Sequence, residues 1–138
     1  MILYISDTDT NARRAAKTAF VYLLISLFLV LFGAVYEIYS HQVYSFYMLY
    51  AFAFPLAGGV LPFSAIHLWG TQWYPNLWTR RLYHAGIATL SVGSIIQGVL
   101  EIYGTTNALA RWYWIIGTGL VLLSIISFCA ERRNYEAE

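Results

Sequence analysis

Two glutamates, Glu37 and Glu101, are the residues of this sequence best placed for chemistry, because each interrupts a long apolar stretch. Where such a stretch crosses a membrane, an acidic side chain is a candidate for binding an ion or a solute. His41 follows Glu37 by four residues, and two carboxylates with an imidazole can bind a divalent cation or pass protons. The alternative is that both carboxylates lie at the membrane surface and bond to tyrosines or to Arg111. No spacing here is typical of a metal site, so we predict none.

One face of the apolar stretch 82–103 carries small and polar residues. A spacing of four places side chains on one helix face, and it relates Ala85, Thr89, Gly93, Gln97 and Glu101. Ser94 and Gly98 lie on the neighbouring stripe, and small residues of this kind let helices pack closely. We therefore expect this face to look inward. The amide of Gln97, one turn before Glu101, needs partners. A polar track ending at Glu101 would provide them, and plain helix packing is the alternative.

The apolar stretch 43–68 contains two prolines around a pair of glycines, Pro55, Gly58, Gly59 and Pro62. Proline removes a main-chain hydrogen bond and clashes with the preceding turn, so we predict a kink or a locally unwound segment here. Carbonyl groups freed at membrane depth must face protein or a water-filled cavity. Broken helices build binding sites in transporters, although proline and glycine are also common in ordinary spanning helices.

Two histidines, His67 and His84, lie near the two ends of the middle loop, about residues 69–81. Histidines on neighbouring helices can ligate haem iron from both sides. Both lie at the edge of an apolar stretch, so the alternative is that they bond to water, lipid headgroups or loop carbonyls. We keep them as metal-ligand candidates only, and we predict no cofactor. The single cysteine, Cys129, rules out a disulfide within the chain.

Tyrosine and tryptophan gather where short loops join the apolar stretches. The first short loop is surrounded by Tyr36, Tyr39, Tyr44, Tyr47 and Tyr50, and the second by Tyr103, Trp112, Tyr113 and Trp114. Aromatic belts of this kind are typical of the membrane–water interface. The alternative is an aromatic cage that binds a cation, which Glu37 and Glu101 would strengthen if they point inward.

Four apolar stretches must position these side chains. Hydrophobic residues make up 59% of the 138 residues and charged residues only 11%, whereas a soluble domain has about 25% charged residues. This composition disfavours a soluble domain and a disordered chain, and the net charge of +1 disfavours a nucleic-acid binder. About 20 apolar residues cross a bilayer of ~30 Å as a helix, and the chain offers four such stretches, 18–39, 43–68, 82–103 and 109–129.

The basic residues predict how these helices are oriented. Seven of the eight lie in the N-terminal segment, the middle loop or the tail: Arg13, Arg14, Lys17, Arg80, Arg81, Arg132 and Arg133. Because cytoplasmic loops are enriched in Lys and Arg, both termini should be cytoplasmic. We predict an all-α integral membrane protein of a bacterial plasma membrane, with one domain over residues 1–138 and four transmembrane helices in an up-down-up-down bundle.

For function we expect a small oligomeric transporter or channel-like protein for a small or cationic solute, with a polar track that opens outward through Glu37, His41, Gln97 and Glu101. The alternatives are a non-catalytic subunit of a larger membrane complex and, less favoured, a haem- or metal-binding redox protein. The sequence contains no Gly-rich phosphate loop, G-x-S-x-G or H-E-x-x-H motif, which disfavours an enzyme. Apart from the lipid bilayer, the expected partner is a second copy or a larger membrane protein.

Overall fold

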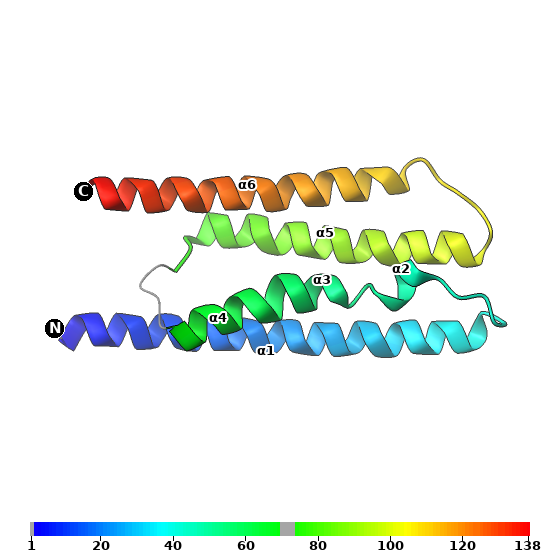
Figure 1. The fold of residues 1–138 in the computed structure, drawn as a ribbon, viewed down its shortest axis with the longest axis horizontal. Helices are drawn as coiled ribbons and strands as arrows, with labels where there is room; N and C mark the ends of the chain where they lie inside the picture. Colours follow the sequence, from blue (N-terminus) through cyan, green and yellow to red (C-terminus); the bar gives the residue numbers. More distant parts are fainter. Residues whose placement is uncertain (1, 70–73) are drawn as a thin grey trace.

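The structure is a computed structural model that describes residues 2–69 and 74–138. Every secondary-structure element within these residues is helical, and none is a strand. In chain order the elements are α1 (Ile2–Tyr39), α2 (Phe46–Leu49), α3 (Ala53–Pro55), the π-helical turn η1 (Leu56–Val60), α4 (Leu61–Trp69), α5 (Leu77–Ile102) and α6 (Ala110–Ala137) (Figure 1).

Three of the described helices are long and apolar enough to cross a membrane: α1 over Asp9–Tyr39, α5 and α6. They correspond to the predicted stretches 18–39, 82–103 and 109–129. The prediction of an all-α chain with membrane-spanning helices is confirmed to this extent within the described residues.

The helix α5 begins earlier than the predicted middle loop allowed. Its first residue is Leu77, whose N–H donates to the side-chain oxygen of Asn76 at 2.7 Å. Such an N-cap satisfies one of the donors that every helix start leaves without a partner. The prediction of a loop over residues 69–81 is therefore wrong for its last five residues, and residues 70–73 lie outside the described part of the chain.

The second predicted stretch, 43–68, is not one long helix. It forms α2, a turn, α3, η1 and α4 in succession, and its longest continuous helical run is Ala53–Trp69. At 1.5 Å per residue this run is about 26 Å long, shorter than a bilayer core of about 30 Å. The π-helical turn lies between Pro55 and Pro62 and contains both glycines of the pair. The structure thus supports three spans by length, and this segment is an interrupted helix.

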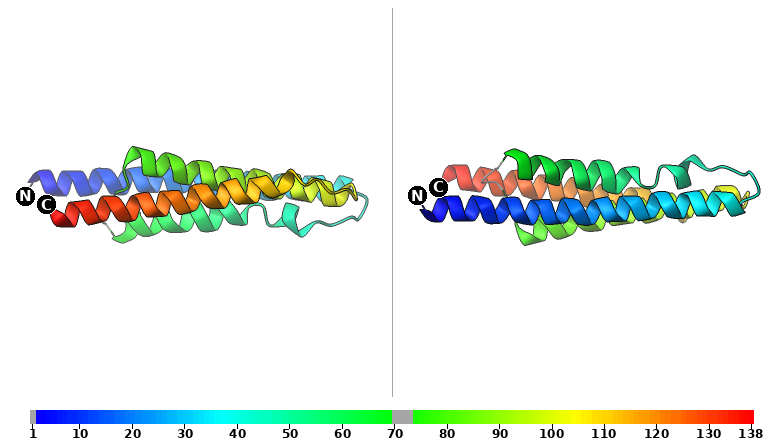
Figure 2. Two further views of the ribbon diagram at one scale, coloured as in Figure 1. Left: turned by 90° about the horizontal axis from the view of Figure 1, so that it is seen from above. Right: turned by 90° about the horizontal axis from the view of Figure 1, so that it is seen from below.

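The helices form an elongated bundle in which both termini lie at the same end (Figure 1). The helix α1 packs along η1 and α4, and α5 packs along α6. Contacts of α2 and α3 with α5 join these two pairs. Figure 1 shows α1 and α6 at opposite edges of the bundle, and the turned views of Figure 2 show α5 and the interrupted helix on its two other sides.

Glycines bring α5 and α6 together along their length. A Cβ atom on Gly93 would lie 2.6 Å from Cβ of Tyr113, and one on Gly117 would lie 2.7 Å from Cγ of Leu90. These glycines therefore sit directly against a neighbouring side chain, as small residues do in membrane helix pairs.

Candidate functional site

The short helix α2 is seated between α1 and α5, at the end of the bundle away from the termini (Figure 1). Met48 is almost fully buried there. A Cβ atom on Gly33 of α1 would lie 3.1 Å from the Met48 carbonyl oxygen, and one on Gly98 of α5 would lie 2.8 Å from the Met48 nitrogen. The hydroxyl of Ser94 donates to the carbonyl of Tyr47 at 2.6 Å. Two glycines and one hydrogen bond therefore define the position of α2.

Glu101 is tied to the start of this short helix. Ser45 is the residue just before α2, but its hydroxyl does not cap that helix. It donates instead to Oε2 of Glu101 at 2.6 Å, and Ser45 itself is 1% exposed. A hydroxyl bonded to a carboxylate is a strong, charge-assisted contact. This bond holds Glu101 in place while the side chain stays open to the surroundings.

Glu37 lies one helical turn beyond Gly33 and so on the face of α1 that packs against α2. Its Oε1 atom is buried and has no hydrogen-bond partner among the described residues. A buried acceptor without a donor is unfavourable, and more so when it carries charge. Glu37 is therefore the carboxylate in this region that a bound cation would stabilise.

A cavity of about 490 Å³ opens at the same end of the bundle. Its wall is built from α1, the loop after it and the end of α5: Phe32, Val35, Tyr36, Tyr39, Ser40, His41, Ile102 and Tyr103. His41 and Gln42 adopt left-handed backbone angles, with φ of 55° and 70°. Such angles are uncommon outside glycine, and they turn the chain back at the tip of α1. The tyrosine cavity, as we call it, thus contains one of the four predicted pathway residues, His41.

The other three predicted pathway residues do not line this cavity. Glu37 and Glu101 are chain neighbours of its lining residues Tyr36 and Ile102, and Gln97 is half-buried further along α5. The hydroxyl of Thr89 donates to the carbonyl of Ala85 in its own helix at 2.7 Å. The polar track through Gln97 therefore stays a prediction.

Two of the four helix-break residues, Gly58 and Gly59, lie at a second polar site, nearer the termini than the tyrosine cavity is. Pro55 and Pro62 line two separate cavities. The hydroxyl of Tyr83 donates to the Gly58 carbonyl in η1. The ring of Tyr22 lies so close to Gly59 that a Cβ atom there would overlap it. The Tyr22 hydroxyl is in turn hydrogen-bonded to Nδ1 of His84. In the π-helical turn, the Gly58 carbonyl thus accepts a hydrogen bond from α5, and Gly59 leaves room for an aromatic ring of α1.

The two candidate histidines have separate protein partners. Nδ1 of His67 is 2.9 Å from the carbonyl oxygen of Ala12, whereas Nδ1 of His84 bonds to Tyr22. Phe63 stacks on the His84 ring with 5.5 Å between centroids. Among the described residues no three His, Cys, Asp or Glu side chains form a group that could hold a metal ion.

Sequence reasoning missed a polar contact between α6 and the start of α5. The carboxylate of Glu131 accepts the N–H of Asn76 at 3.1 Å and the hydroxyl of Thr79. The hydroxyl of Ser124 donates to the Thr79 carbonyl at 3.0 Å. Ser124, Ser127 and Glu131 follow one another at spacings of three and four, so their shared helix face was a signal that this side of α6 looks inward.

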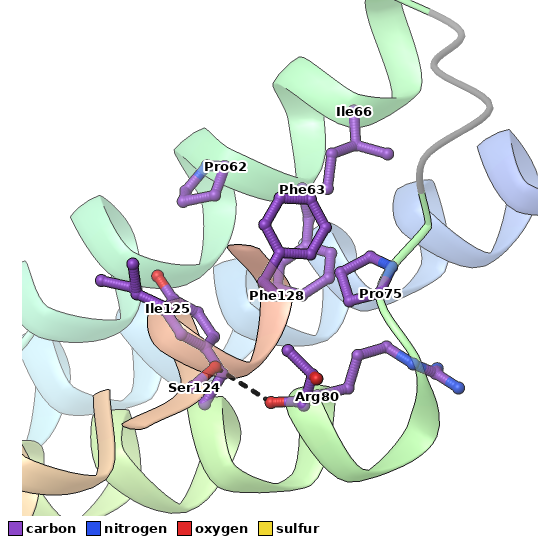
Figure 3. Close-up of a pocket in the computed structure, with 10 residues that line it drawn as sticks. Pro62, Phe63, Ile66, Pro75, Arg80, Ser124, Ile125 and Phe128 are labelled. Atoms are coloured by element: carbon purple, nitrogen blue, oxygen red, sulfur yellow. Dashed lines mark hydrogen bonds between the residues drawn. The ribbon is translucent and has the colours of Figure 1, made fainter. Parts of the chain in front are cut away.

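The same contact borders a smaller cavity of about 200 Å³ between α4, α5 and α6 (Figure 3). Arg80 lies at its edge, with the guanidinium 4.8 Å from the ring centroid of Tyr74 and Nη1 donating to the Tyr74 hydroxyl at 3.4 Å. Its Nε is buried and has no partner among the described residues. The cavity is otherwise lined mainly by apolar side chains such as Phe63, Ile125 and Phe128.

Comparisons of this chain with protein-family models, with curated proteins and with solved structures found no match.

Proposed function

We propose that the chain crosses the membrane four times, with both termini on the cytoplasmic side of a bacterial plasma membrane. The return of both termini to one end of the bundle supports an even number of crossings (Figure 1). The interrupted helix is about 4 Å shorter than the bilayer core, and α2 extends the segment further toward the opposite end. The basic residues at the end with the termini support its cytoplasmic placement.

We propose further that the protein is a small transporter or channel-like protein for a cationic solute, which it binds in the tyrosine cavity at the outer end. The observation that carries this proposal is a cavity of about 490 Å³ whose wall includes Tyr36, Tyr39 and Tyr103. Its size lies within the range of small-molecule sites, about 300–1,000 Å³.

The chemistry of this cavity suits a cation. The face of a tyrosine ring attracts an ammonium group, by about 0.5–2 kcal/mol depending on desolvation. Glu37 and Glu101 adjoin the lining residues in the chain, and a buried oxygen of Glu37 has no donor within the part of the chain that the structure describes. Two carboxylates near an aromatic wall concentrate cations at the site. The path by which a bound cation would cross the membrane stays a prediction based on Gln97 and Glu101.

Transport is tested with the purified chain in liposomes. Uptake of radiolabelled tetramethylammonium should exceed that of protein-free liposomes, and Tyr103→Leu and Glu101→Gln should each reduce it several-fold. Glu136→Gln is the matched control, because it removes the same charge from the exposed end of α6. Uptake equal to that of empty liposomes, or uptake that Tyr103→Leu and Glu101→Gln leave unchanged, would contradict the proposed site.

A non-catalytic membrane subunit is the second candidate. The specific observation in its favour is Gly119 on α6, where an added Cβ atom would meet no atom within 4 Å. The large apolar residues Leu122, Leu123 and Ile126 on this helix are more than half exposed, and close helix packing in membranes uses a small residue among such side chains. Purification from native membranes in mild detergent separates the candidates, since a subunit would retain a second membrane protein at fixed stoichiometry.

A further inference from the structure

A groove of about 720 Å³ runs between α1 and α5, along the middle of α1. On α1 its lining extends from Lys17 to Leu29, and on α5 from His84 to Ile95, with Pro55 of α3 also on the wall. Twelve residues of helix rise about 18 Å, which is slightly more than half the thickness of a bilayer core of about 30 Å. The groove therefore has the depth of one membrane leaflet.

The wall of the groove presents apolar surface along this length. Phe28 and Val92 on its two sides are 63% and 46% exposed. The hydroxyls of its polar lining residues are bonded inside the protein: Thr18 to the Arg14 carbonyl, Ser91 to the Ile87 carbonyl and Tyr22 to His84. An occupant of the groove therefore meets hydrocarbon rather than free hydrogen-bonding groups.

Lys17 gives the groove one charged end. Among the described residues of the lining it is the only charged one, and no described carboxylate forms an ion pair with it. It stands at the start of the apolar stretch 18–39, where the headgroup layer begins and where a long side chain reaches the interface. A flexible apolar molecule with one anionic end matches this arrangement in both charge and depth.

We propose that this groove binds an anionic phospholipid of the inner leaflet, with an acyl chain between α1 and α5 and the phosphate at the ammonium of Lys17. The site is separate from the tyrosine cavity, which shares none of its lining residues and begins at Phe32, beyond the end of the groove at Leu29. Lipid in the groove covers apolar surface that neither helix covers, and it strengthens the packing between α1 and α5.

Native mass spectrometry of the intact chain tests this site. The protein is released from detergent that contains equimolar phosphatidylglycerol and phosphatidylcholine with the same acyl chains. We expect one phosphatidylglycerol to be retained several-fold more often than phosphatidylcholine. Equal retention of the two lipids would overturn the proposal, and so would a protein dimer without bound lipid, since a second copy would then fill the groove.

Two variants separate the headgroup contact from the groove. Lys17→Gln should remove the preference for phosphatidylglycerol, and Ala88→Trp, which fills the groove with an indole ring, should reduce retention of both lipids. The matched controls are Arg133→Gln in the tail and Gly119→Trp on α6, neither of which lines the groove; both should behave like the unmodified chain. Helix content by circular dichroism confirms folding of each variant. A folded Ala88→Trp that still retains phosphatidylglycerol would overturn the proposal.

Discussion

The hydroxyl of Tyr22 and Nδ1 of His84 are hydrogen-bonded between α1 and α5, although 62 residues separate them in the chain. Phe63 of α4 lies against both rings, with centroid distances of 6.0 Å to Tyr22 and 5.5 Å to His84. Gly59 in η1 leaves the space that the Tyr22 ring fills. These contacts therefore hold α1, the interrupted helix and α5 in register, and the Tyr22 hydroxyl and Nδ1 of His84 satisfy each other.

Tyr22→Phe should lower the free energy of unfolding by roughly 1 kcal/mol, which is typical of a hydrogen bond between membrane helices. The ring stays against Gly59, so packing is preserved while the bond to His84 is lost. Unfolding in mixed micelles of sodium dodecyl sulfate measures the change. A double-mutant cycle with His84→Phe isolates the pair, and a coupling energy of zero would show that the bond contributes nothing to stability.

Gly59→Ala should destabilise the protein by about 1–3 kcal/mol, the usual effect of adding a methyl group where no space exists. The new Cβ atom would overlap the Tyr22 ring, which Phe63 and His84 prevent from moving aside. Gly119→Ala is the control, because its Cβ atom meets nothing within 4 Å. The same unfolding measurement should leave that variant unchanged or slightly more stable, and an equal loss in both would contradict the close approach.

Much of the helical fold can be predicted from local sequence, but the contacts of the interrupted helix cannot. Long apolar stretches predict α1, α5 and α6, because a backbone surrounded by lipid must satisfy its own hydrogen bonds. The prolines at 55 and 62 indicate that the second stretch is distorted. The Gly58 carbonyl in the distorted segment is bonded to the hydroxyl of Tyr83 on α5. The space beside Gly59 is filled by the ring of Tyr22 on α1. The local sequence cannot predict these contacts, because the partners are 25 or more residues away in the chain.

The candidate sites show the same limit. Glu37 and Glu101 stand out in sequence as acids in apolar stretches, but the bond of Glu101 to Ser45 joins residues 56 apart. The contact of Glu131 with Asn76 joins residues 55 apart. Such pairs depend on which helices pack together and on how far one helix is shifted along the other. The spacing within α6 indicates an inward face but cannot say which helix meets it.

Gly98→Val should disrupt the packing of α2 against α5. The added side chain would take the place of the Met48 backbone, since even a Cβ atom would lie 2.8 Å from the Met48 nitrogen. The measurement is the rate at which a maleimide labels Met48→Cys in a Cys129→Ser background, and Gly98→Val should raise it several-fold. Gly119→Val should leave the labelling rate unchanged. Equal rates in the Met48→Cys protein and in its Gly98→Val and Gly119→Val variants would mean that Gly98 does not hold α2.

The proposed four-span topology predicts which residues a membrane-impermeant maleimide reaches in intact cells. Tyr44→Cys and Thr106→Cys, each in a Cys129→Ser background, lie in the two loops opposite the termini and should react from outside. The native Cys129, an exposed residue near the end of α6, should react only after lysis. If Tyr44→Cys and Thr106→Cys react from opposite sides, the interrupted helix does not cross the membrane.

Glu131→Ala should lower the free energy of unfolding by about 2 kcal/mol, because it removes a charged acceptor from two donors at the start of α5. The N–H of Asn76 loses its acceptor, and the hydroxyl of Thr79 keeps only the Ser127 hydroxyl at 2.8 Å. Thr79 is 3% exposed, so water replaces the lost carboxylate poorly there. The positive end of the α5 helix dipole adds to the effect of removing an anion there.

Glu136→Ala on the same helix is the matched control for this charge. Its ion pair with Arg132 at 3.3 Å leaves both side chains 60% exposed, and exposed pairs of this kind contribute less than about 0.5 kcal/mol. Unfolding in mixed micelles should therefore separate the two alanine variants by more than about 1 kcal/mol. Equal losses would show that the Glu131 carboxylate acts only as a surface charge and does not hold the start of α5 to α6.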